Sequence, residues 1–180
     1  MNEIKAYRIL LFYKYVSIVD PGVFARDHLK LCKELGLKGR ILVAKEGING
    51  TVSGTVENTD QYMEHMRQSP LFSDMDFKVD ASEGHAFAKL FVRPRDELVS
   101  FRLAKDIDPN ERTGTHLTPQ QFYQQMQKDD CVILDGRNEY EYEIGHFRNA
   151  IRPKVESFRD FPQWIRENLS QYKDKPILTY

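Results

Sequence analysis

The sequence predicts an α+β domain followed by part of a second, α/β domain, and three observations support this prediction. Strand-like and helix-like segments follow one another in the order strand, helix, strand, strand, helix, strand in the N-terminal half. A polar stretch with proline and glycine but no periodicity interrupts this pattern at residues 104–117. Short apolar runs then alternate with helical patterns again. We therefore expect one domain at 1–103, a linker at 104–117 and a second domain at 118–180.

The first strand and helix follow from local pattern. A nearly continuous apolar run at 6–16 predicts a central strand buried on both faces. A helix is expected to begin at Pro21, with Asp20 as its N-cap, and to stop at Gly36. These two elements open the α+β domain.

The following strands are expected to form a hairpin. Apolar segments at 40–44 and 51–53 flank Asn49-Gly50, a dipeptide that is a strong signal for a hairpin turn. A second helix is expected at 56–68, with strands at 77–79 and 89–92 after it. This order is that of the ferredoxin-like fold, in which both helices cover one face of an antiparallel sheet.

The second domain begins at a capping box. Thr118 and Gln121 have the required spacing, with proline between them at the first helical position. The short apolar run 131–134 precedes Asp135, as is typical of a buried parallel strand. An aromatic-rich helix at 158–169 and a strand at 176–180 complete the pattern, which predicts an α/β domain.

Composition excludes several classes of protein. With 41% hydrophobic and 12% aromatic residues, the 180-residue chain can form packed cores, and its net charge of −1 argues against a general polyanion binder. We find neither an apolar stretch of roughly 18 residues nor a secretory signal at the start, so no membrane contact is expected. Two cysteines far apart, Cys32 and Cys131, fit a cytoplasmic protein better than a disulfide framework.

A multi-part motif follows the apolar run of the second domain. Its members are Asp135, Arg137, Glu141, Gly145 and His146. A carboxylate at the end of a buried strand needs a partner, and Arg137 is close enough to provide one. We expect Gly145 to permit a tight backbone before His146. No member is a strong nucleophile, so a mainly structural role is favoured.

Two segments carry a family resemblance. Residues 133–146, together with Pro176 to Tyr180, resemble the first part of a rhodanese domain. The stretch Gly39 to Gly54 resembles a characteristic segment of the bacterial tRNA uridine hydroxylase family. Those proteins carry a ferredoxin-like (acylphosphatase-like) domain ahead of a rhodanese domain. The resemblance implies oxygen-dependent hydroxylation of the wobble uridine to 5-hydroxyuridine, with molecular oxygen as co-substrate and the tRNA anticodon region as partner.

The same resemblance places the catalytic cysteine directly after Tyr180, where the sequence stops. We therefore expect residues 1–180 alone to be inactive, with no catalytic residue among them. Cys131 and Cys32 lie on apolar segments, where a thiol is typically inert. We expect the last strand to pair in parallel beside 131–134, with a hollow at its carboxyl end. We also expect this half to be loosely packed, oligomeric or completed by a C-terminal fragment.

Candidate substrate-binding residues lie in the N-terminal half: Lys45, Glu46, Asn49, Arg93 and Arg95. The first three belong to the expected turn and either shape it or face substrate. The two arginines lie in a basic segment with interleaved phenylalanines, which suits phosphates and splayed bases. Simple strand alternation, with phenylalanines inward and charges outward, accounts for the same pattern.

Cofactors are not indicated by any motif. The five histidines have no metal-type spacing, and we find no flavin, haem or iron motif, so the group that activates oxygen is unknown. Two alternative functions stay open. One is a rhodanese-type sulfurtransferase that uses a cysteine persulfide, and the other is a non-catalytic module that binds RNA or protein.

Overall fold

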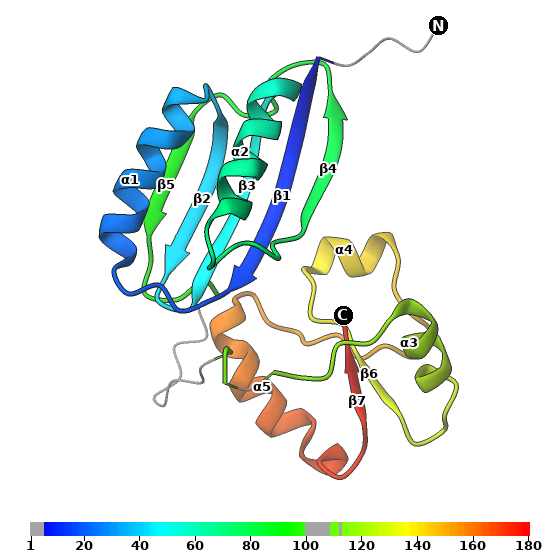
Figure 1. Ribbon diagram of the computed structural model, residues 1–180. Helices are drawn as coiled ribbons and strands as arrows, with labels where there is room; N and C mark the ends of the chain where they lie inside the picture. Colours follow the sequence, from blue (N-terminus) through cyan, green and yellow to red (C-terminus); the bar gives the residue numbers. More distant parts are fainter. Residues whose placement is uncertain (1–5, 100–108, 112) are drawn as a thin grey trace, which may run out of the picture. The chain divides into compact units, whose positions relative to one another are not determined.

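The computed structural model describes residues 6–99, 109–111 and 113–180, and the chain divides into two compact units (Figure 1). The described part of the first unit is 6–98 with 109–111, and that of the second is residue 99 with 113–180. Much of the expected linker, residues 104–108 and 112, lies outside the described residues.

The first unit is a five-stranded sheet with two helices on one of its faces (Figure 1). The strand order is β4-β1-β3-β2-β5, and neighbours are antiparallel except β5, which is parallel to β2. The elements are β1 (Tyr7–Tyr15), α1 (Pro21–Glu34), β2 (Lys38–Ala44), β3 (Gly47–Thr55), α2 (Val56–Gln68), β4 (Phe77–Ser82) and β5 (Leu90–Pro94). The predicted ferredoxin-like arrangement is confirmed, with β5 added in parallel at one edge.

Both helices begin where the sequence predicts. The Asp20 carboxylate accepts a hydrogen bond from the Val23 backbone N–H at 2.9 Å, which satisfies one of the unpaired donors at the start of α1. The Thr55 hydroxyl accepts the Asn58 N–H at 3.2 Å at the start of α2. Gly36, with φ of 59°, lies just past the end of α1 in the left-handed conformation that glycine adopts without strain.

Strand β1 is central but is buried on one face only, so the prediction of burial on both faces was wrong. Leu10 and Phe12 are buried against the helices, whereas Leu11 is 44% and Tyr13 58% exposed. Buried and exposed positions alternate within the apolar run, because every second residue of the run faces away from α1 and α2.

The hairpin between β2 and β3 turns at Lys45 and Glu46, so the predicted turn at Asn49-Gly50 was wrong. Asn49 and Gly50 lie within β3, paired with Tyr13 and Phe12 of β1. A Cβ added to Gly50 would lie 2.4 Å from Cζ of Phe12. Glycine is therefore needed at this position to admit the phenylalanine ring, not to form a turn.

Aromatic side chains fill the core between sheet and helices. Phe12 contacts Phe77 and Tyr62, with ring centroids 5.3 Å and 5.6 Å away. His28 on α1 is buried, and its Nε2 lies 2.9 Å from the hydroxyl oxygen of Tyr62. Burial lowers the pKa of His28 to about 4, so this histidine is a neutral core residue.

The second unit contains a two-stranded parallel sheet and short helices. Its elements are α3 (Pro119–Met126), β6 (Val132–Leu134), α4 (Glu139–Ile144), η1 (Phe158–Asp160), α5 (Phe161–Asn168), η2 (Ser170–Tyr172) and β7 (Ile177–Thr179). The capping box that opens α3 is confirmed, since Thr118 and Gln121 cap each other. Helix α4 was not predicted. Ile151 adds a single parallel bridge to Leu134 of β6.

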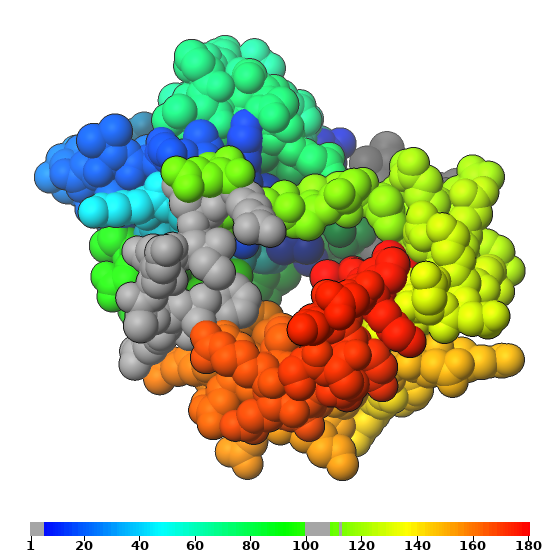
Figure 2. Space-filling view, turned by 90° about the horizontal axis from the view of Figure 1, so that it is seen from below, coloured from blue at the N-terminus to red at the C-terminus, as the bar shows by residue number. Residues whose placement is uncertain are grey.

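The hydrophobic cluster of the second unit is small. It consists of buried Leu134, Phe161 and Leu169, with partly buried neighbours around them. The C-terminal residues, red in Figure 2, lie at the surface of this unit, and Leu178 alone of β7 is buried. The second unit therefore has the smaller buried apolar cluster of the two, and the expectation that it is loosely packed, oligomeric or completed by a C-terminal fragment stays a prediction.

Candidate functional site

Asp135 is the centre of a hydrogen-bonded cluster at the carboxyl end of β6. Its side chain is fully buried, and its backbone N–H donates to the Ile151 carbonyl at 2.9 Å. Arg137 donates from Nε to Oδ1 at 3.0 Å and from Nη2 to Oδ2 at 2.7 Å, a two-pronged ion pair. The same Nη2 donates to the Gly145 carbonyl at 2.8 Å. The sequence-predicted pair therefore forms, and it fixes the loop after β6.

The pKa values in this cluster follow from the contacts. Hydrogen bonds from Arg137 lower the pKa of Asp135 to about 2, outweighing the opposite effect of burial. The Asp135 carboxylate in turn raises the pKa of Arg137. Asp135 is therefore ionised at neutral pH and serves as an acceptor, not as a proton donor.

Tyr180 joins this cluster, which the sequence did not indicate. Strands β6 and β7 pair in parallel, as predicted. The Gly136 N–H donates to the Tyr180 carbonyl at 3.1 Å, and the Phe147 N–H donates to the Tyr180 hydroxyl at 3.1 Å. The guanidinium carbon of Arg137 lies 4.8 Å from the centre of the Tyr180 ring. Burial raises the pKa of Tyr180, and its hydrogen bond with the Asp135 carboxylate adds to this effect. Tyr180, at the end of β7, is thus hydrogen-bonded to the loop after β6 through Gly136 and to the loop after α4 through Phe147.

The remaining motif residues have partners within α4 and its ends. The Glu141 carboxylate accepts the Asn138 N–H at 3.1 Å and so caps the start of α4. His146 Nδ1 lies 2.9 Å from the Tyr142 carbonyl oxygen, and its ring stacks on Tyr142 with centroids 3.7 Å apart. Gly145 has a φ of 174°, an extended conformation open to any residue, so the predicted need for glycine there was wrong.

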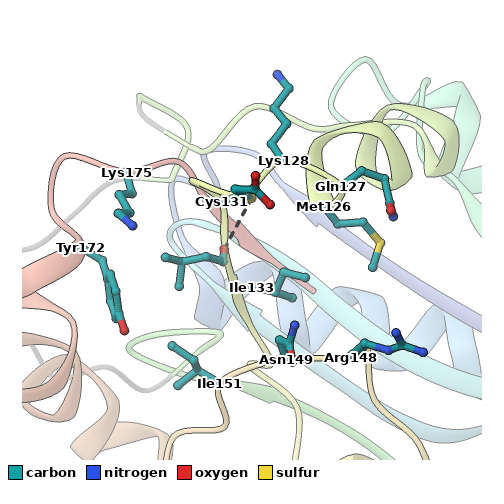
Figure 3. Close-up of a pocket in the computed structure, with 12 residues that line it drawn as sticks. Met126, Gln127, Lys128, Cys131, Ile133, Arg148, Asn149, Ile151, Tyr172 and Lys175 are labelled. Atoms are coloured by element: carbon teal, nitrogen blue, oxygen red, sulfur yellow. Dashed lines mark hydrogen bonds between the residues drawn. The ribbon is translucent and has the colours of Figure 1, made fainter.

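A cavity of about 620 Å³ lies beside the amino end of β6 (Figure 3). Lys128, Arg148, Asn149 and Lys175 are among the side chains that line it. The predicted hollow was at the opposite, carboxyl end of the strands. That hollow stays a prediction; at the carboxyl end the side chains of Arg137 and Tyr180 pack against each other.

Neither cysteine is an activated nucleophile. Cys131 lines the cavity in Figure 3, and its Sγ lies 3.9 Å from the Val132 carbonyl oxygen. Burial is the largest cause that raises the pKa of Cys131, and burial raises that of Cys32 to about 12. Because their pKa values are raised, both thiols are protonated at neutral pH. They are unreactive, since a reactive cysteine requires a lowered pKa.

The five candidate substrate-binding residues separate into two groups. Lys45 and Glu46 form the β2–β3 turn, and the Glu46 carboxylate accepts the Leu98 N–H at 2.5 Å, so it stabilises the first unit. Asn49 and Arg93 are exposed on the sheet face opposite the helices. Arg95 is exposed just after β5, where its N–H donates to the Val43 carbonyl at 2.8 Å.

The described ranges contain neither a cluster of metal-binding side chains nor a membrane-spanning helix. Residues 6–99, 109–111 and 113–180 contain no group of three or more His, Cys, Asp or Glu side chains arranged to hold a metal ion. Over those same ranges, no helix is both long enough and apolar enough to span a bilayer.

The fold and this cluster define a two-domain protein with an acylphosphatase-like unit followed by a rhodanese-like unit. The chain belongs to the family whose model is described as "UPF0176 acylphosphatase like domain", which matches residues 7–98. A second model, "Rhodanese-like domain", matches residues 118–180.

Curated relatives match nearly the whole chain. Proteins named "tRNA uridine(34) hydroxylase" from Bacillus licheniformis, Oceanobacillus iheyensis and Staphylococcus carnosus are 63%, 55% and 56% identical over 97%, 100% and 97% of this chain. The aligned segment is 54%, 56% and 55% of those proteins. The chain therefore spans about half the length of the relatives that it matches.

Proposed function

We propose that this protein acts in the hydroxylation of the wobble uridine of tRNA, forming 5-hydroxyuridine with molecular oxygen as co-substrate. The observation that carries this proposal is the identity of 55–63% to proteins named tRNA uridine(34) hydroxylase across both units of the chain. Identity at this level over an acylphosphatase-like and a rhodanese-like unit in the same order supports a shared reaction.

The reaction is proposed to take place at the carboxyl ends of β6 and β7. The cluster of Asp135, Arg137 and Tyr180 holds this edge in place, and we assign these residues, with Glu141, Gly145 and His146, a positioning role. We propose that a nucleophilic cysteine follows Tyr180 in the whole protein, and the rhodanese-like match at 118–180 supports this proposal. Consecutive backbone N–H groups around such a sulfur would stabilise its thiolate.

The proposed partner is the anticodon region of tRNA. Four of the candidate residues, Lys45, Asn49, Arg93 and Arg95, offer exposed polar or basic side chains on the first unit for contacts with it. A cytoplasmic location, where tRNA is modified, is part of this proposal and agrees with two cysteines that form no disulfide.

Mass spectrometry of tRNA nucleosides tests the proposed reaction. Deleting the gene should remove 5-hydroxyuridine and the nucleosides derived from it, and a plasmid copy of the whole gene should restore them. A plasmid that encodes residues 1–180 alone should not restore them. Its two cysteines, Cys32 and Cys131, are protonated thiols, and neither belongs to the carboxyl ends of β6 and β7. Unchanged nucleosides after deletion would reject the proposal.

Persulfide sulfur transfer is a second candidate, supported by the rhodanese-like match at 118–180. It predicts thiosulfate:cyanide sulfurtransferase activity for the product of the whole gene and unchanged wobble uridine in the deletion strain. If neither activity depends on the gene, a non-catalytic binding module is the remaining interpretation.

A further inference from the structure

The face of the five-stranded sheet that is turned away from α1 and α2 carries aromatic and basic side chains side by side. We call it the outer sheet face and define it by Leu11, Tyr13, Arg40, Asn49, Phe91 and Arg93, all of which are exposed. Their neighbours along each strand, such as Phe12, Ile41 and Val92, are buried on the helix side. Alternation along the strands therefore places these six side chains on one surface.

Strand register arranges these residues in two adjoining rows. In one row Tyr13 is opposite Asn49, and Leu42 separates Asn49 from Arg93. In the other, Leu11 is opposite Thr51, which is opposite Arg40, which is opposite Phe91. Each row crosses four strands, a width of about 15 Å, and the rows are about 7 Å apart.

Phe91 departs from simple alternation of apolar-inward and charged-outward residues. It is 41% exposed and shares its face with Arg93, whose guanidinium carbon lies 4.9 Å from the centre of the Phe91 ring. The neighbouring inward position is filled by Val92, which is buried. The interpretation of phenylalanines inward and charges outward was therefore wrong at this position.

The outer sheet face is positive although the chain has a net charge of −1. Arg40 and Arg93 lie in its rows, and Lys78 is opposite Leu11 on β4. Asp80 is the acidic residue at the neighbouring paired position of β4. None of the salt bridges formed among the described residues uses Arg40, Arg93 or Lys78.

We propose that the outer sheet face binds single-stranded RNA. Bases stack on Tyr13 and Phe91, and Arg40 and Arg93 neutralise phosphates of the same strand. Arg40, Arg93 and Lys78 outnumber Asp80 on this face, and this excess of positive charge beside exposed rings matches the phosphates and bases of an RNA strand, which favours RNA over a protein partner. That this RNA is the anticodon loop of a tRNA rests on the proposed function. The assignment of the outer sheet face as an RNA-binding surface is independent of that function.

Fluorescence anisotropy with the 180-residue chain tests this proposal. The probes are a labelled anticodon stem-loop with a wobble uridine and a fully paired RNA of the same length. The variants Tyr13→Ala and Phe91→Ala should each weaken stem-loop binding roughly tenfold. Arg40→Ala and Arg93→Ala should also weaken it, and each should reduce the salt dependence by about 0.7 in the slope of log K against log salt.

Matched controls come from the same chain. Tyr123, which lies on α3 and is 62% exposed, is the matched control for Tyr13, which is 58% exposed. Arg26, which is exposed on α1, is the matched control for Arg93. Tyr123→Ala and Arg26→Ala should leave stem-loop binding unchanged. Circular dichroism should show that every variant retains its fold, because each truncated side chain is exposed.

The possible results separate this proposal from the proposed function. Stem-loop binding that survives the four substitutions, or its absence in the unmodified chain, overturns RNA binding by the outer sheet face. If only the two arginine variants lose stem-loop binding, and the unmodified chain binds the paired RNA equally well, stacking of bases on this face is overturned. The nucleoside measurement on the deletion strain is independent of all these results, so either proposal can fail while the other stands.

Discussion

At the scale of single residues, one buried carboxylate organises the edge of the rhodanese-like unit. Asp135 accepts hydrogen bonds from the backbone and side chain of Arg137, and Arg137 extends to the Gly145 carbonyl and the Tyr180 ring. A buried charge that loses its partner is strongly destabilising. The loop after β6 is therefore held in place by an interaction that depends on the ionised form of Asp135.

The stability of the second unit should for this reason depend on pH. The pKa of Asp135 falls from its ordinary 3.8 to about 2 in the folded chain. A lowered pKa gives stability that is fully present above the unfolded value and is lost as pH falls from about 4 to about 2. Urea unfolding followed by Trp164, the single tryptophan, which packs on the core of this unit, measures the effect.

The comparison uses Asp135→Asn, which keeps the shape of the side chain and removes its charge. The unmodified chain should be more stable than Asp135→Asn at about pH 6, and the difference should shrink at about pH 2.5. Asp174→Asn, at an exposed position before β7, should show no such trend. An equal difference at both pH values would contradict the assigned role.

At the scale of elements, the β2–β3 hairpin shows packing overriding a local turn signal. Asn49-Gly50 is typical of a turn, yet the chain turns at Lys45 and Glu46. The reason lies in long-range contacts. A Cβ at Gly47 would lie 2.1 Å from the Lys14 carbonyl oxygen, and one at Gly50 would overlap the ring of Phe12. Both glycines thus serve the close approach of β1 to β3, which no local pattern reveals.

Gly50→Ala tests this explanation. The added methyl group should destabilise the first unit by about 1–3 kcal/mol, because the core around Phe12 is closely packed. Urea denaturation measures the loss. Gly84→Ala, where nothing lies within 4 Å of the added Cβ, should change stability by less than about 0.5 kcal/mol.

A second substitution distinguishes packing from turn geometry. Asparagine suits the left-handed positions of a hairpin turn, so Gly50→Asn would be tolerated if residue 50 formed the turn. The structure predicts a larger loss than for alanine, because the longer side chain meets Phe12 and Ile41. A stable Gly50→Asn variant would contradict the register of β3.

The same contrast explains how much of the molecule could be predicted from sequence. Periodicity and caps gave the helices α1, α2 and α3 and the fold class of both units, because these features are local. The pair of Asp135 and Arg137 was also predictable, since the two residues are separated by one position. The contacts of Tyr180 and the shared face of Tyr13 and Phe91 were not, because they depend on strand register across the sheet.

At the scale of the whole molecule, two hydrophobic clusters of different size stabilise the two units. The first unit buries an aromatic core that includes Phe12, Tyr62 and Phe72. The second has Leu134, Phe161 and Leu169 at its centre. Stability rises with buried apolar area, so the second unit should be the weaker one.

Denaturation in urea should accordingly occur in two steps. Trp164 fluorescence should report the first step, and far-ultraviolet circular dichroism should show a further loss of structure at higher urea. Phe161→Ala should lower only the first transition and Phe12→Ala only the second, each by about 3–5 kcal/mol. The two phenylalanines are matched, with 8% and 2% of their surface exposed. A single transition that both variants shift equally would show that the units unfold together, which would contradict separate cores.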